Sequence, residues 1–128
     1  MSNPKILIVD DEPDVVTLIE NALKPDGFVV VHAYDGIEAL DLVGIENLDL
    51  ILLDIMMPMM SGYQVCAQIK ANPQTQHIPV VCITSAHAAD AVAQSQRVGA
   101  ATLITKPFPP AELLAKLKRH LPQAQSNN

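Results

Sequence analysis

The sequence predicts a doubly wound α/β fold, in which helices cover both faces of a parallel β-sheet. Short apolar runs of strand length alternate along the chain with longer segments whose apolar residues recur at helical spacing. The short runs are almost continuously apolar, which is typical of strands that are buried on both faces. Strands that alternate with helices form parallel sheets, and 128 residues are enough for one such domain with a proper core.

Five strands and five helices are expected in strict alternation. The strands are expected at residues 5–9, 28–31, 50–53, 79–83 and 101–105, because each is a short apolar run bounded by polar, Gly or Pro residues. The helices are expected at residues 13–23, 37–43, 63–71, 87–98 and 110–120. Residues 1–121 therefore form the domain, and the polar residues 122–128 are expected to be a disordered tail.

Several residues indicate where the helices begin, end and face the core. Pro13 suits a first helical turn, and Gly44 is expected to end the second helix. The fourth helix is rich in alanine and has few large apolar residues, so we expect it to be the least firmly packed. The side chains expected to face the core are Val15, Val16, Ile19, Ala22 and Leu23 in the first helix, Ile37, Ala39, Leu40 and Val43 in the second, Val65, Cys66 and Ile69 in the third, and Leu113, Leu114, Leu117 and Leu121 in the fifth.

The composition excludes several classes of function. A net charge of −6 and a pI near 4.9 argue against direct nucleic-acid binding, which needs clustered Lys and Arg. No apolar run is long enough to span a bilayer, and no leader peptide is recognisable, so we expect a cytoplasmic protein that does not bind membranes. Cys66 and Cys82 are expected to be reduced and buried, with a disulfide between them as the alternative.

Three acidic residues follow two of the expected strands. Asp10 and Asp11 come directly after the first strand, and Asp54 ends the third. Short connections and right-handed crossovers favour the flavodoxin-like strand order 2-1-3-4-5, in which the order reverses between the first and third strands. Ligands of such folds bind outside the carboxyl ends of the strands at that reversal, so we expect the three carboxylates to lie together there.

This group of side chains suits phosphoryl chemistry. Carboxylates without His or Cys favour a hard cation, and Mg²⁺ fits best because it keeps waters and binds phosphate oxygens. Thr84 and Lys106 end neighbouring strands, and a hydroxyl and an ammonium are phosphate-binding groups. Asp54 is then the natural nucleophile, since a carboxylate can accept a phosphoryl group as an acyl phosphate.

Four blocks of sequence, in order, resemble the receiver domains of bacterial two-component response regulators, the chemotaxis-regulator-like fold. The blocks are ILIVDDEP at residues 6–13, DIMMPMMSG at 54–62, ITSA at 83–86 and TKPF at 105–108. The resemblance extends from Lys5 to about Leu121. Each block alone is a weak signal, but the four together at this spacing are highly specific.

The resemblance implies a role for each site residue. Asp54 would accept a phosphoryl group from the phosphohistidine of a sensor histidine kinase or a phosphotransfer protein. Asp10, Asp11, Asp54 and the backbone carbonyl of Met56 would hold Mg²⁺, for which Mn²⁺ can substitute. The remaining roles are Thr84 as a hydrogen-bond donor to the phosphoryl oxygens, Lys106 as their ion-pair partner, Pro107 as the second residue of a cis peptide bond, and Ser85 as a tuning position beside Thr84.

Three positions depart from the common pattern of the family or tune its kinetics. Leu103 stands where many relatives carry the Tyr or Phe of an aromatic switch, so coupling between Thr84 and the last strand must differ here. Met56 and Ala86 occupy positions that tune dephosphorylation, and neither side chain can orient a water molecule. We therefore expect slow autodephosphorylation, on the order of minutes or longer.

The expected output is a change in protein binding. No effector segment follows Leu121, so another protein would read the phosphoryl state on the face made by the fourth helix, fifth strand and fifth helix. The chain would act as a phosphoacceptor rather than as an enzyme, and as a monomer or a weak phosphorylation-dependent dimer. The alternative is a receiver-like module that binds partners constitutively without phosphorylation. The methionines of the 54–62 block are expected to pack in the loop and helix entry rather than form a recognition surface.

Overall fold

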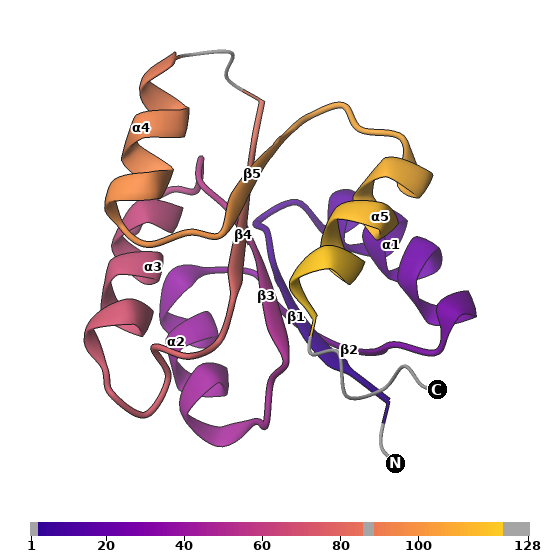
Figure 1. Cartoon of the computed structure of the whole chain (residues 1–128), viewed down its shortest axis with the longest axis horizontal. Helices are drawn as coiled ribbons and strands as arrows, with labels where there is room; N and C mark the ends of the chain where they lie inside the picture. The colour runs from indigo at the N-terminus through magenta and orange to yellow at the C-terminus, as the bar shows by residue number, and fades with distance from the viewer. Residues whose placement is uncertain (1–2, 86–88, 122–128) are drawn as a thin grey trace.

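A computed structural model describes residues 3–85 and 89–121 and shows five strands alternating with five α-helices (Figure 1). The strands are β1 (Lys5–Val9), β2 (Val29–Ala33), β3 (Leu50–Asp54), β4 (Val80–Thr84) and β5 (Thr102–Thr105). The helices are α1 (Pro13–Leu23), α2 (Gly36–Ile45), α3 (Gly62–Ala71), α4 (Ala89–Arg97) and α5 (Pro110–His120), and a 3₁₀ turn, η1 (Lys24–Asp26), follows α1. The expected 122–128 tail lies outside the described residues.

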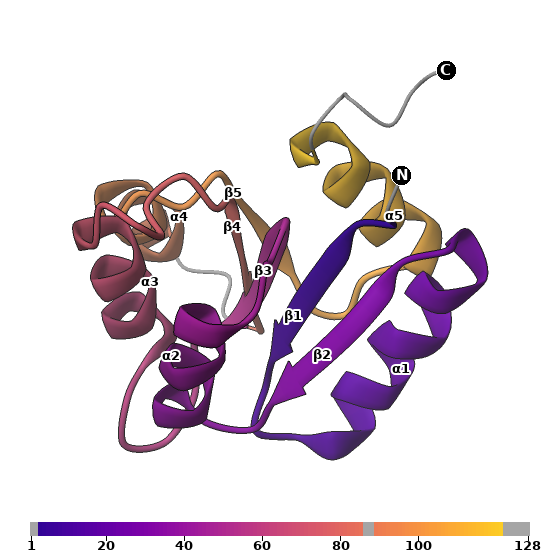
Figure 2. The ribbon, with the colours of Figure 1, turned by 90° about the horizontal axis from the view of Figure 1, so that it is seen from below.

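The strands form one parallel sheet in the order β2-β1-β3-β4-β5. Figure 2 shows α1 and α5 on one face of this sheet, with α2, α3 and α4 on the other. The predicted doubly wound fold and its strand order are therefore confirmed. None of the described helices is both long and apolar enough to cross a membrane.

Two apolar clusters, one on each face of the sheet, explain why the strands read as continuous apolar runs. In β1, Leu7 and Val9 pack on the side of α2 and α3, whereas Ile6 and Ile8 pack on the side of α1 and α5. Successive side chains of a strand point to opposite faces, so a strand covered on both sides needs an apolar residue at every position. Cys66 and Cys82 lie in the first cluster as free, buried thiols, as expected.

The second helix differs most from its prediction. Asp35 caps α2 by accepting a hydrogen bond from the Glu38 backbone at 2.8 Å, and the helix continues through Gly44 to Ile45. Gly44 therefore does not end it, because the Glu46 backbone N–H still bonds to the Leu42 carbonyl. Ile37, which was expected to face the core, is 63% exposed. The buried face of α2 is formed by Gly36, Ala39 and Val43, and Ile37 lies outside that face.

The other differences are small shifts of element ends. β2 runs to Ala33 rather than Val31, because Ala33 pairs with Val9 of β1. Residues 86–88 lie outside the described part of the chain, so the expected start of the fourth helix at His87 is not covered. Among the described side chains of α4, Ala91 and Ser95 are buried and Val92 is half exposed. The buried side chains described for this helix are thus small, and the expectation that it is the least firmly packed helix stays a prediction.

Candidate functional site

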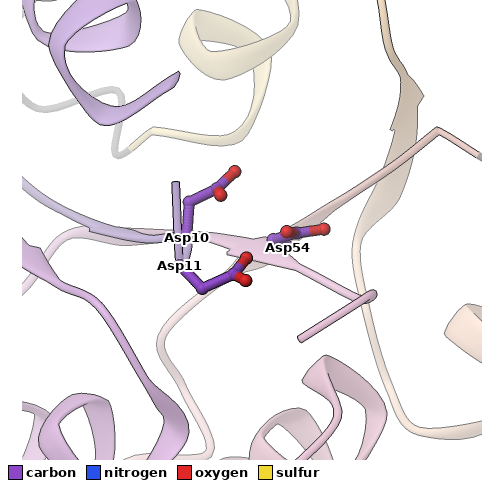
Figure 3. A group of neighbouring side chains, drawn as sticks. All are labelled: Asp10, Asp11 and Asp54. Carbon is purple, nitrogen blue, oxygen red and sulfur yellow. The ribbon is translucent and has the colours of Figure 1, made fainter. Parts of the chain in front are cut away.

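The carboxylates of Asp10, Asp11 and Asp54 meet at the carboxyl edge of the sheet (Figure 3). One oxygen of each carboxylate lies within 4.8 Å of the others. Asp10 follows β1 and Asp54 ends β3, the two strands between which the strand order reverses. Asp10 and Asp54 are buried and Asp11 is exposed, so the group opens to solvent on the side of Asp11. The sequence prediction that these residues lie together is confirmed.

Backbone hydrogen bonds orient both buried carboxylates. Oδ1 of Asp10 accepts a hydrogen bond from the Glu12 backbone at 2.9 Å, and Oδ1 of Asp54 accepts one from the Met56 backbone at 3.1 Å. In each case the donor lies two residues further along the chain, in the loop that leaves the strand. The Oδ2 atoms of both residues are left to face Lys106.

The loop between β3 and α3 packs closely against the backbone of Asp54. Gly62 donates its backbone N–H to the Ile55 carbonyl at 3.0 Å, and Ile55 donates to the Ile83 carbonyl of β4 at 2.9 Å. A Cβ atom on Gly62 would collide with the Asp54 carbonyl oxygen and would lie 2.7 Å from the Ile55 Cα. Only glycine therefore allows α3 to begin this close to the end of β3.

Lys106 brings a positive charge to the site from the end of β5. Its backbone N–H bonds to the Thr84 carbonyl at 2.7 Å, and the Lys106–Pro107 peptide is cis, as the resemblance implied. Its Nζ lies 3.1 Å from Asp10 Oδ2, 3.6 Å from Glu12 Oε1 and 3.7 Å from Asp54 Oδ2. One ammonium is thus shared by three carboxylates.

Burial and like charge set the proton affinity of Asp54. Burial is the main reason that the pKa of Asp54 rises from 3.8 to about 6, and the negative charge of Asp10 adds to it. The Lys106 ammonium and the Met56 N–H oppose this rise, while Asp11 adds a smaller increase. Burial alone would lower the pKa of Lys106, but its hydrogen bond to Asp10 and the surrounding carboxylates outweigh burial and raise it.

The remaining residues of the predicted site occupy the same edge or the neighbouring strands. Thr84 is buried at the end of β4, in register with Thr105, and Ser85 after it is exposed. Leu103 of β5 is partly buried and packs against the cluster that contains Cys82. Pro107 is exposed, and Ala86 lies outside the described residues.

The methionines of the loop divide into two pairs. Met57 is buried and Met60 packs against the core cluster, as the packing interpretation predicted. Met56 is 61% exposed and Met59, with a φ of 69°, is 99% exposed, so the prediction is wrong for these two. A positive φ is uncommon for a residue other than glycine, and at Met59 it lies in the bend of the loop between β3 and α3.

Glu12 is a site residue that sequence reasoning did not identify. Its contact with Lys106 joins residues from opposite ends of the chain and depends on the side-chain direction at the start of α1. The only signal for it is that Glu12 is the third acid in the run Asp10-Asp11-Glu12.

The donor set suits a hard divalent cation. Among the described residues, no His or Cys joins the group that could hold a metal ion, and all its ligand atoms are carboxylate oxygens. The site gathers four carboxylates, three of which lie near the Lys106 ammonium and the fourth, Asp11, beside Asp10 and Asp54, so among the described residues it carries excess negative charge. Oxygen ligands and uncompensated negative charge are what Mg²⁺ or Mn²⁺ requires.

Comparison with known proteins identifies the family. The family model of the response regulator receiver domain matches residues 6–118. The chain is 36% identical over 118 residues to Protein PilG of Pseudomonas aeruginosa, covering 92% of this chain and 87% of that protein. The chemotaxis protein CheY4 of Vibrio cholerae has a TM-score of 0.89 at 30% identity, covering 94% of this chain and all of that one.

A second solved structure shows a comparable similarity. The receiver domain of a signal transduction histidine kinase from Syntrophus aciditrophicus has a TM-score of 0.87 at 32% identity, covering 98% of this chain and 95% of that chain. The fold, the acidic site and these similarities agree. The chain therefore belongs to the response regulator receiver domain family, the receiver domains of two-component and chemotaxis signalling.

Proposed function

We propose that this protein is a phosphorylation-activated switch in which Asp54 accepts a phosphoryl group from a phosphohistidine. The donor would be a sensor histidine kinase or a phosphotransfer protein. The observation that carries the proposal is the position of Asp54, buried at the end of β3 with Lys106 Nζ 3.7 Å from its Oδ2 and two further carboxylates beside it. The protein would act as a phosphoacceptor rather than as an enzyme, and it would assist its own Mg²⁺-dependent phosphorylation and dephosphorylation.

The transfer step uses the charges already gathered at the site. A carboxylate oxygen of Asp54 forms a bond to phosphorus while the phosphorus–nitrogen bond of the donor breaks, and the imidazole leaves with the bonding electron pair. A pKa of about 6 leaves most of Asp54 ionised at neutral pH, as a nucleophile must be. The Lys106 ammonium is in reach to pair with the transferred oxygens, and the Thr84 hydroxyl lies on the adjacent strand to hydrogen-bond them.

Asp10, Asp11, Asp54 and the backbone carbonyl of Met56 would hold Mg²⁺, with Mn²⁺ able to substitute. The fit rests on the three carboxylates whose oxygens lie within 4.8 Å of one another. When bound, the ion would neutralise negative charge on the phosphoryl oxygens during transfer. Asp10 would keep its hydrogen bond to the Glu12 backbone, which holds the carboxylate in a fixed orientation.

The output would be a change in protein binding on the face formed by α4, β5 and α5. A groove of about 240 Å³ lies between α4 and β5 and is lined by residues that include Val92, Ser95 and Leu103. Leu103 packs against the core from one wall of this groove, so a rotamer change there would alter the surface offered to a partner. The protein would work as a monomer or as a weak dimer that phosphorylation strengthens.

Intact mass measurement tests the proposed function. The protein is incubated with acetyl phosphate and Mg²⁺, beside an Asp54→Asn variant and a metal-free sample. Gain of one phosphoryl group only with Asp54 and metal present is the expected result. No gain from acetyl phosphate or from a phosphohistidine donor would refute the switch and favour a receiver-like module that binds partners constitutively.

A further inference from the structure

The Glu12 side chain contacts Lys106 from the last residue of the loop that leads into α1. Its Oε1 lies 3.6 Å from Lys106 Nζ, a little closer than the 3.7 Å between Nζ and Asp54 Oδ2. Glu12 is 64% exposed, whereas Asp10 and Asp54 are buried. The ammonium has three hydrogens and faces three carboxylates, two that are buried in the site and one at its mouth.

The position of Glu12 directly before α1 makes this contact unusual. Glu12 is the N-cap residue of α1, and its carbonyl accepts the backbone N–H groups of Val15 and Val16 at 3.1 and 3.2 Å. Side chains at N-caps commonly accept a hydrogen bond from the first helical turn. The Glu12 side chain makes no such bond and is directed to Lys106 instead. Replacing this side chain would therefore remove the contact with Lys106 without removing a side-chain cap from the helix.

The contact with Glu12 opposes the phosphorylated state in two ways. Lys106 must turn toward new phosphoryl oxygens, so it has to give up one of its present partners, and the exposed Glu12 is the least costly to lose. The phosphoryl group also adds about one net negative charge close to the Glu12 carboxylate, because an aspartyl phosphate carries about two negative charges where the Asp54 carboxylate carried one. Both effects favour the unphosphorylated protein.

We propose that Glu12 is a positioning residue that holds Lys106 toward the mouth of the site and so restrains phosphorylation of Asp54. This inference rests on the proposed function, because it concerns the same phosphoryl transfer. With acetyl phosphate as donor, an Asp54 oxygen bonds to phosphorus while the bond from phosphorus to the acetate oxygen breaks, and acetate leaves with the electron pair. Glu12 takes no part in bond making and acts through Lys106.

The test compares Glu12→Gln with Asp14→Asn, at saturating Mg²⁺ and with intact mass as the readout. Asp14 is exposed in the first turn of α1, and no ion pair joins it to Lys106 in the described structure, so its variant loses the same charge without losing the contact. Relative to Asp14→Asn, Glu12→Gln is expected to gain the phosphoryl group about two- to five-fold faster and to lose it more slowly. The differences between the two variants in the rates of phosphoryl gain and loss should become smaller at about 1 M salt, because salt screens the exposed ion pair between Glu12 and Lys106.

The Lys106 ammonium signal in ¹⁵N NMR gives a readout that does not depend on phosphorylation. The chemical shift of this signal should change in Glu12→Gln and should stay the same in Asp14→Asn. Equal rates of phosphoryl gain and loss in the two variants would overturn the inference. A faster gain of the phosphoryl group without a slower loss would also overturn it, because that result shows only reduced repulsion of an anionic donor. If the unaltered protein gains no phosphoryl group at all, the proposed function fails, while the NMR comparison still decides whether Glu12 positions Lys106.

Discussion

Asp54 destabilises the metal-free protein at neutral pH, and its replacement by Asn should therefore stabilise the fold. Asparagine has nearly the same shape and can still accept the hydrogen bond from the Met56 backbone, but it carries no charge to be buried beside Asp10. A carboxyl whose pKa is raised on folding binds its proton more tightly in the folded state. Its contribution is therefore favourable at low pH and is lost as the pH rises from about 4 through about 6.

The size of this effect follows from the pKa of Asp54. A rise from 3.8 to about 6 corresponds to about 3 kcal/mol at pH 7.5, at about 1.4 kcal/mol for each pKa unit. The ion pair with Lys106 is already included, since it lowers the same pKa. We expect Asp54→Asn to raise the free energy of unfolding by about 2–3 kcal/mol at pH 7.5. Near pH 4.5 the increase in the free energy of unfolding should be about a third of its value at pH 7.5, because the Asp54 carboxyl of the folded protein is then protonated.

Urea denaturation followed by far-ultraviolet circular dichroism measures the change, because the chain has no tryptophan to follow by fluorescence. The buffers contain a chelator, and the pH runs from 4.5 to 8. Asp41→Asn, an exposed carboxylate on α2, is the matched control and should change the free energy of unfolding by less than about 0.5 kcal/mol. Mg²⁺ should stabilise the unaltered protein more than the Asp54→Asn variant, so that their free energies of unfolding differ less when the ion is present. A variant that is no more stable than the unaltered protein, with the same dependence on pH, would refute the reasoning.

Three further predictions concern the stability of the fold and the lifetime of the phosphorylated protein. Gly62→Ala should lower the free energy of unfolding by about 1–3 kcal/mol in urea denaturation, because its Cβ has no room beside the Asp54 backbone; unchanged stability would show that the loop adapts freely. Lys106→Met should lower the thermal midpoint in calorimetry, most strongly above pH 6, because it leaves Asp10 and Asp54 without their cation; an equal loss at pH 4.5 would contradict this reason. Met56→Asn and Ala86→Glu should each speed the decay of the phosphorylated protein severalfold in time-resolved mass measurements, and unaltered decay would count against a slow rate set by these positions.

Much of the site was predictable because strand ends are easy to read. Asp54 comes directly after an apolar run, and Asp10 and Asp11 come directly after another. In a parallel sheet all carboxyl ends lie at one edge, so the strand order alone brings these residues together. The Lys106–Pro107 cis peptide could not be derived in this way, and the resemblance to receiver domains supplied it.

The errors share one cause, which is that sequence spacing does not determine the direction of a side chain at the end of an element. Ile37 was expected to face the core, but it is exposed while Ala39 and Val43 of the same helix are buried. Met56 and Met59 were expected to pack in the loop, but they are exposed while Met57 is buried and Met60 packs against the core.

The sequence by itself determined the layers, the strand order and the identity of the acidic residues at the sheet edge. Those features follow from local periodicity and from chain connectivity, which every stretch of the chain carries on its own. Only the tertiary structure decided that one ammonium is shared by Asp10, Glu12 and Asp54, and that burial raises the pKa of Asp54. Distances between charges and the loss of water around them depend on segments far apart in the chain, and packing alone brings those segments together.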